Sequence, residues 1–337
     1  MTGITAWQQQ VPIPQCYVGA NAWPIPLNPA LADTVIPVDS IHFTRGAIAV
    51  AVNGVPIFNP HTNTGVDAFL DGQLDEFGGH SGRADDYHYH IAPLHLYGQT
   101  ASTRPIAYAL DGYAVYGDAE PEGGPMLPLD TNHGHFGTEG VYHYHGSAVA
   151  PYMIGNMVGQ VTEDVTHQIV PQAHANPVRP ALTPLQGAVI TDCTPNADNN
   201  GYTLVYTVAG VTDSIVYSWT TDGTYTYNYY VNGALTTDTY QDFVPCTIST
   251  AMLDRPVAPK DLSLFPVPAT SSVSVRVGGD IRPQDVRGIT IVDLKGEVLF
   301  NVPRYTGTID TRGLAPGTYL MHVQLPTSTV TKKLIIR

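Results

Sequence analysis

The sequence Tyr87-His88-Tyr89-His90 occurs a second time as Tyr142-His143-Tyr144-His145. In an extended strand, successive side chains point to opposite faces, so His88 and His90 lie on one face and the two tyrosines on the other. The two imidazoles are then about 6.7 Å apart at Cα, close enough for both rings to turn onto one metal ion. The repeated tetrad therefore predicts two strands that each present a pair of histidine ligands.

The similarity between the two tetrad regions extends upstream. A shift of 55 positions, which carries residue 87 onto residue 142, aligns three motifs without a gap: Leu74-Asp75 with Leu129-Asp130, Gly79-His80 with Gly134-His135, and the first tetrad with the second. The apolar runs 47–54 and 106–112 align at a shift of 58. This pattern predicts an internal duplication. Each half supplies three imidazoles: His80, His88 and His90 in the first, and His135, His143 and His145 in the second.

Composition limits the classes of protein to which the chain can belong. Its 337 residues are enough for two or three domains, and 43% hydrophobic residues are typical of a globular protein. The net charge of −14 argues against nucleic acids and anionic membrane surfaces as partners. No run approaches the roughly 18 apolar residues that a membrane span requires. Abundant Gly, Pro and Tyr indicate short strands and tight turns, so we predict a mainly β fold.

The chain divides into four predicted segments. Residues 1–45 are rich in proline and form an extended arm. Residues 46–180 form the duplicated metal-binding body, with hairpin turns at Asn53-Gly54 and Asp111-Gly112. Residues 181–258 contain a Thr- and Tyr-rich antiparallel meander that either closes the body or flanks it. A linker at Ala258–Lys260 leads into residues 259–337, which form a small β-sandwich.

The three cysteines have no Cys-x-x-Cys spacing, which argues against a thiolate zinc site. Cys193 and Cys246 flank one β-rich segment and could form a disulfide. Cys16 would then be left over.

The six repeated histidines allow several metal arrangements. Two separate three-histidine sites would each leave a position open for water or substrate. Alternatively, the two halves could face each other in one dinuclear centre of six histidines, or the two His-x-His pairs could chelate one ion. All-imidazole ligation suits copper or zinc, and we prefer copper because the surroundings are rich in tyrosine. The other histidines are individually expected to be structural or exposed: His42, His61, His95, His133, His167, His174 and His322.

Carboxylates and tyrosines near the tetrads have their own expected roles. Asp75 and Asp130, at the same offset in both halves, are expected to orient ligands by accepting an imidazole N–H. The acidic loop 67–86 could bind calcium, although a solvated loop is the simpler interpretation. The tetrad tyrosines are expected to fill the core with their hydroxyls bonded, with a redox or proton-transfer role as the alternative: Tyr87, Tyr89, Tyr142 and Tyr144.

Two resemblances to known families add to this interpretation. Residues 30–250 resemble the YHYH-domain family, through both tetrads, Gly79-His80, Asp111–Gly117 and Pro151–Gly155. This family implies a fold more than a reaction.

The end of the chain is similar to the C-terminal sorting domain of the type IX secretion system of Bacteroidetes. The carrying motifs are Leu264–Ala269, Leu314–Tyr319 and Lys332–Ile336, with Val267 where the family usually has Asn. The resemblance implies recognition by that machinery and an extracellular or cell-surface location. An N-terminal secretory signal is absent from this sequence, and we expect it to have been removed.

Two functions follow from these observations. The first is a secreted metalloenzyme of unknown substrate, a copper oxidoreductase or, as the second choice, a zinc-dependent hydrolase. The alternative is a non-catalytic extracellular protein, adhesive or metal-binding, in which the metal is structural or cargo. A three-histidine site open to a cleft favours the enzyme, whereas a closed four-ligand site favours the alternative.

Overall fold

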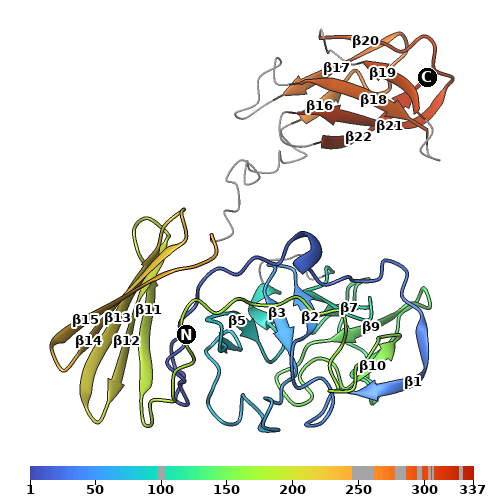
Figure 1. The fold of residues 1–337 in the computed structure, drawn as a ribbon. Helices are drawn as coiled ribbons and strands as arrows, with labels where there is room; N and C mark the ends of the chain where they lie inside the picture. Colours follow the sequence, from blue (N-terminus) through green and yellow to red (C-terminus); the bar gives the residue numbers. More distant parts are fainter. Residues whose placement is uncertain are drawn as a thin grey trace. The chain divides into compact units, whose positions relative to one another are not determined.

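The computed structural model describes residues 1–97, 103–244, 262–277, 286–293, 298–302, 305, 307–325 and 329–337. The described residues are almost entirely β, as predicted, and include two short 3-10 helices, η1 (Gly19–Asn21) and η2 (Leu94–Leu96). The chain forms two compact units, Met1–Cys246 and Thr247–Arg337 (Figure 1). The predicted linker Ala258–Lys260 lies outside the described residues. No described helix is long and apolar enough to cross a membrane.

An eight-stranded sheet forms the centre of the first unit. In spatial order its strands are β4 (Gly79–Ser81), β5 (Tyr87–Tyr89), β3 (Pro56–Phe58), β2 (Ala47–Ala51), β6 (Ala107–Ala109), β7 (Ala114–Tyr116), β9 (Tyr142–His145) and β8 (Gly134–Phe136). β2 and β6 pair antiparallel in the middle, with Ala49 opposite Ala109. Outside this pair, β3 pairs antiparallel with β2, and β7 pairs antiparallel with β6. The tetrad strands β5 and β9 follow in parallel, and β4 and β8 form the antiparallel edges.

This arrangement has the same strand order on both sides of the β2–β6 pair. It places the two tetrad strands, β5 and β9, near opposite edges of the sheet. The equal order agrees with an internal duplication, which stays a prediction.

The sheet is built from short apolar runs that end at tight turns. The β2 run, Ala47–Ala51, has four buried residues because small side chains let both faces be covered closely. The predicted turns at Gly54 and Gly112 are confirmed, with φ of 85° and 96°, values that a side chain with a Cβ rarely adopts. A two-stranded sheet of β1 (Leu31–Pro37) and β10 (Asn156–Gly159) completes this region.

The Thr- and Tyr-rich segment forms the predicted antiparallel meander. Its strands are β11 (Val189–Pro195), β12 (Gly201–Val208), β13 (Val211–Trp219), β14 (Thr224–Val231) and β15 (Ala234–Gln241). They make a separate five-stranded sheet with its own core rather than closing strands of the eight-stranded sheet. The N-terminal arm packs on this core, where the Trp7 ring lies 4.9 Å from that of Tyr206.

A buried ion pair joins the body to the meander region. Arg179 Nε lies 2.7 Å from Asp85 Oδ2, and its Nη2 lies 2.8 Å from Asp85 Oδ1. Arg179 also donates to the Tyr229 hydroxyl of β14, while Asp85 accepts from the backbone N–H of Val11. Both charges therefore have two or more partners, as buried charges require.

The second unit contains two sheets. One consists of β16 (Leu262–Phe265), β17 (Ser272–Val277) and β20 (Ile309–Asp310). The other has the order β19 (Val298–Val302), β18 (Gly288–Val292), β21 (Gly317–Gln324) and β22 (Thr329–Ile336). Alternating apolar residues of both sheets form one buried cluster, so the unit has a core of its own.

The possible disulfide between Cys193 and Cys246 does not form in the structure. Cys193 is a free thiol, and burial raises its pKa. It lies on β11 and packs against the meander core, beside the β12 residue Leu204. Cys16, expected to be left over, is the disulfide-bonded cysteine, and Cys246 lies outside the described residues.

Candidate metal centres

Strand register brings the three histidines of each half together. On β4 and β5, His80 lies directly opposite His88. On β8 and β9, His135 lies opposite His143 in the same register. The last histidine of each tetrad follows two residues later and therefore shares the face of the first. Each Gly-His motif thus supplies the third ring from the edge strand.

The glycine before each edge histidine makes room for a tetrad tyrosine. A Cβ at Gly79 would lie 2.6 Å from the His88 carbonyl oxygen and 2.7 Å from the Tyr87 hydroxyl. At Gly134 the matching distances are 2.2 Å to the His143 carbonyl and 2.6 Å to the Tyr142 hydroxyl. These distances are too short for a Cβ, so each hairpin requires glycine at this position.

In the first cluster, three imidazoles converge through their Nε2 atoms. His90 Nε2 lies 3.1 Å from His88 Nε2 and 3.1 Å from His80 Nε2. The Nδ1 atoms of His88 and His90 face the backbone carbonyls of Asp86 and Asn59 at 2.9 and 2.6 Å. A carbonyl only accepts, so both Nδ1 atoms carry the proton and both Nε2 atoms present a lone pair. Nitrogens bound to one ion at about 2.0 to 2.1 Å are about 3 Å apart, which these separations match.

Burial keeps His80 and His90 in the form that binds metal. Burial and, to a smaller extent, the neighbouring His88 lower the pKa of His80 to about 3, against the opposing effects of Asp86 and the Gln73 backbone. Burial, with the charges of its two neighbours, also holds the pKa of His90 well below its ordinary value. Both rings are therefore neutral at physiological pH, as metal ligands must be.

The first cluster opens onto a cavity of about 260 Å³. All three histidines line it, together with Thr62, Asn63 and the ring of Phe58, which stacks on His88 at 4.0 Å. Two exposed arginines, Arg45 and Arg83, also line the cavity, and neither has a polar partner among the described residues.

In the second cluster, a carboxylate closes the three-histidine arrangement. Glu120 Oε2 lies 3.1 Å from His135 Nε2 and 3.3 Å from His143 Nε2, and its Oε1 lies 3.7 Å from His145 Nε2. The His145 Nδ1 donates to the Gly117 carbonyl at 2.7 Å. Its Nε2 is buried without a hydrogen-bond partner among the described residues, which suits an atom that binds a metal.

Glu120 is buried, and its ionisation is stabilised by its neighbours. Burial acts to raise its pKa, but the Leu127 backbone N–H, a hydrogen bond from His135 and the charges of His135 and His145 together lower it. The carboxylate is therefore ionised and available as a fourth ligand. Glu120 could not be predicted by comparing the two halves, because the residues aligned with it in the first half, Thr62 and Gly65, are not acidic.

The two clusters are supported by equivalent contacts at matching positions. Asn59 and Gly117, whose carbonyls hold His90 and His145, are 58 positions apart, the shift that aligns the apolar runs. The His135 Nδ1 faces the Pro128 carbonyl at 3.4 Å. In the first half, the Gln73 backbone, 55 positions before Pro128, acts to raise the pKa of His80. Backbone carbonyls therefore orient the rings in both halves.

The six histidines do not form one centre. Their two groups belong to β4–β5 and β8–β9, with β3, β2, β6 and β7 between the tetrad strands in the sheet. The dinuclear centre and the single ion chelated by both His-x-His pairs are therefore wrong, because the halves meet through β2 and β6. Two separate three-histidine groups remain.

Asp75 and Asp130 do not hold the imidazoles, which corrects the expected role. Asp75 accepts from the Tyr87 hydroxyl at 2.9 Å, and Asp130 accepts from the Tyr142 hydroxyl at 2.9 Å. These carboxylates lie on the tyrosine side of the hairpins, away from the ligand nitrogens, and cap nearby backbone N–H groups.

The tetrad tyrosines pack in the core, as the structural interpretation predicts. The Tyr144 hydroxyl donates to Asp111 Oδ2 at 2.6 Å, and the Tyr89 hydroxyl accepts from Asn53 at 3.0 Å. Burial raises the pKa of Tyr89 and Tyr144, so both remain protonated.

The acidic loop 67–86 gives the calcium hypothesis no support. Asp71, Asp75, Asp85 and Asp86 contact separate partners: the Gln73 amide, Tyr87, Arg179 and His88, respectively. In the part of the chain that the structure describes, every group of three or more potential ligands contains histidine.

Comparison with known families agrees with both resemblances. Residues 22–124 match the family described as YHYH protein, and residues 263–337 match the secretion system C-terminal sorting domain. The chain carries a YHYH domain and a type IX sorting domain. The YHYH match is shorter than the expected 30–250. It includes the first cluster and Glu120 but ends before the second tetrad.

Other comparisons add little. No curated protein matches the chain. Among solved structures, the chain is similar to PorZ, described as an essential bacterial surface component of the type-IX secretion system of Porphyromonas gingivalis. The identity is 10%, the TM-score is 0.19, and the match covers 47% of this chain and 23% of PorZ. At that score the similarity carries no argument about fold or function.

Proposed function

We propose that the protein is an exported metalloprotein whose two YHYH clusters have different roles. The open cluster of His80, His88 and His90 binds a copper ion, or zinc as the alternative, that takes part in chemistry on an unidentified substrate. The closed cluster of Glu120 with His135, His143 and His145 holds a structural ion. Export through the type IX system follows from the sorting domain.

The observation that carries this proposal is the difference at the fourth ligand position. Glu120 occupies it in the second cluster, where His143 lines a separate pocket, whereas all three histidines of the first cluster line one cavity and have no carboxylate in their group. Catalytic sites keep an open position, and structural sites fill all four. One chain thus combines both kinds of site on hairpins of the same register.

The residues around the open cluster are suited to hold an ion and a small ligand. Three Nε2 atoms provide the metal ligands, and the backbone carbonyls of Asn59 and Asp86 fix the rings of His90 and His88. Asp86 Oδ2 also lies 3.3 Å from His88 Nδ1, which makes that imidazole a more basic metal ligand. Bound copper would supply redox chemistry there, and bound zinc would supply Lewis-acid chemistry.

The charge at the cavity favours an anionic ligand. Arg45 and Arg83 line its rim in a chain that has 15 basic residues against 29 acidic ones. A guanidinium forms paired hydrogen bonds with carboxylate or phosphate, so such a group on the substrate would be held beside the ion.

Azide binding to copper-loaded single variants tests this division of roles. His143→Ala leaves the open cluster intact, and His88→Ala leaves the closed one. With one equivalent of copper per chain, we expect azide to change the EPR signal of the open cluster in His143→Ala and to leave the signal of the closed cluster in His88→Ala unchanged. Failure of both variants to retain copper or zinc would overturn the metal proposal. Equal responses to azide would overturn the difference in role.

A non-catalytic metal-binding function is the second candidate, and the closed cluster favours it. If azide reaches neither ion while both are retained, both clusters are structural and the protein is not a metalloenzyme of this kind.

A further inference from the structure

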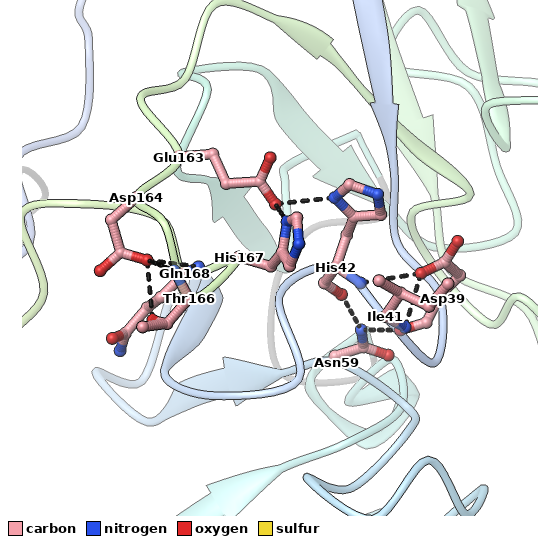
Figure 2. A network of polar contacts seen from close by, with 9 residues as sticks. All are labelled: Asp39, Ile41, His42, Asn59, Glu163, Asp164, Thr166, His167 and Gln168. Atoms are coloured by element: carbon pink, nitrogen blue, oxygen red, sulfur yellow. Dashed lines mark hydrogen bonds and ion pairs between the residues drawn. The ribbon is translucent and has the colours of Figure 1, made fainter.

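A third group of potential ligands lies apart from the YHYH tetrads. His42 Nδ1 is 2.7 Å from Glu163 Oε1, and His167 Nδ1 is 3.0 Å from the same oxygen. The two imidazole centroids are 4.7 Å apart (Figure 2). His42 and His167 were each expected to be structural or exposed. Glu163, which brings them together, lies 121 positions from His42 in the sequence.

Local turns hold the three side chains in place. Asp164 Oδ1 accepts from the backbone N–H groups of Thr166 and Gln168, which turns the chain so that His167 faces Glu163 (Figure 2). The Phe43 N–H donates to the His167 carbonyl at 2.7 Å and fastens this loop to the segment that carries His42. The cluster is therefore built from two segments that are tied together by the backbone.

We propose that His42, Glu163 and His167 form a third metal site, for a divalent transition cation such as zinc or copper. Both imidazoles direct Nδ1 at one carboxylate oxygen. The nitrogen–oxygen separations match adjacent positions around an ion bound at about 2.0 to 2.1 Å, which are about 3 Å apart. Two histidines with one carboxylate are an established donor set for such ions.

Exposure gives this site a different character from the YHYH clusters. The His167 side chain is 48% exposed, whereas His42 and Glu163 are 24% and 18% exposed. Water can therefore reach the remaining coordination positions, and we expect the ion to exchange more readily than at the buried clusters.

One residue connects this site to the open cluster. The Asn59 side-chain amide donates to the carbonyls of Asp39 and His42, as Figure 2 shows, while its backbone carbonyl accepts from His90 Nδ1. Because a change at one site can disturb the other through Asn59, metal at the third site must be counted with the YHYH clusters both present and removed.

Zinc stoichiometry measured by equilibrium dialysis and elemental analysis tests the third site. In the His88→Ala, His143→Ala double variant, we expect one equivalent of zinc to bind, and Glu163→Gln or His167→Ala in that background to abolish it. His174→Ala, which changes an exposed histidine outside the cluster, is the matched control and should retain the equivalent. No zinc in the double variant, or unchanged binding after Glu163→Gln, would overturn the proposal.

The same count in the otherwise wild-type chain covers the case in which the double variant does not fold. Glu163→Gln and His167→Ala should each remove one equivalent relative to wild type, while the azide response of the open cluster is kept. An unchanged equivalent count would overturn the third site alone. Loss of the azide response in wild type would instead count against the proposed function.

Discussion

Glu120 Oε2 lies 3.1 Å from His135 Nε2, whereas the group of His80, His88 and His90 contains no carboxylate among the described residues. The charge and position of Glu120 therefore distinguish a closed site from an open one on otherwise similar hairpins.

Glu120→Gln should weaken metal binding at the closed cluster. The amide keeps an oxygen at the fourth position but removes its charge, so we expect affinity to fall about 10- to 100-fold, as for other changes to residues that support a metal site. Competition with a chromophoric chelator in the His88→Ala background measures this. Glu122→Gln, an exposed neighbour, is the matched control. Equal affinities for the two variants would show that Glu120 is not a ligand.

Neutralising Arg83 should weaken the binding of anions at the open cluster and leave the binding of neutral ligands unchanged. Arg83→Gln removes one exposed charge from the cavity rim, and such a charge contributes at most about 1 kcal/mol, or about fivefold in affinity. Azide and imidazole titrations of the copper-loaded protein compare the two ligand classes. Arg104→Gln, which lies outside the cavity lining, should change neither titration. A loss of imidazole affinity as large as that of azide would contradict a purely electrostatic role.

Metal-free protein should lose stability in acid through His80. Its pKa is about 3 in the fold and about 6.5 in the unfolded chain. Between these values the unfolded state binds the proton that folded His80 does not, so stability falls as pH drops from about 6.5 toward about 3. His80→Asn should make the dependence of melting temperature on pH shallower over this window. If melting temperature depends on pH with the same slope in wild type and variant, His80 does not cause the loss of stability in acid.

Breaking the buried pair of Asp85 and Arg179 should destabilise the first unit strongly. Arg179→Met leaves Asp85 buried without its cation, at a cost of about 3 to 5 kcal/mol in the free energy of unfolding. Tryptophan fluorescence during urea unfolding reports on this unit, because Trp7, Trp23 and Trp219 all lie in it. Adding Asp85→Asn should recover part of the loss. Arg312→Gln, which breaks an exposed pair in the second unit, should leave the transition unchanged.

Much of each cluster could be predicted from the sequence. Strand alternation put His88 and His90 on one face, and the offset of 55 paired His80 with His135. Both predictions depend on local geometry and on comparison of the two halves. The turns at Gly54 and Gly112 and the antiparallel meander were predicted in the same way.

The remaining features depend on contacts between distant segments. The separation of the two clusters follows from the pairing of β2 with β6, which no local pattern determines. Glu120 lies in an irregular loop with no periodicity to mark it, and Glu163 meets His42 across 121 positions. The acceptors of the ligand imidazoles are mostly backbone carbonyls, as at Asn59 and Gly117, and these leave no trace in side-chain identity.

A crystal structure of the zinc-loaded protein, with anomalous scattering recorded at the zinc edge, tests the two-cluster account most directly. We expect one peak bound by His80, His88 and His90 with a non-protein ligand in the fourth position. A second peak should be bound by His135, His143, His145 and Glu120, with metal–ligand distances of about 2.0 to 2.2 Å. Absence of anomalous density from both clusters, or a non-protein ligand in place of Glu120, would contradict the account.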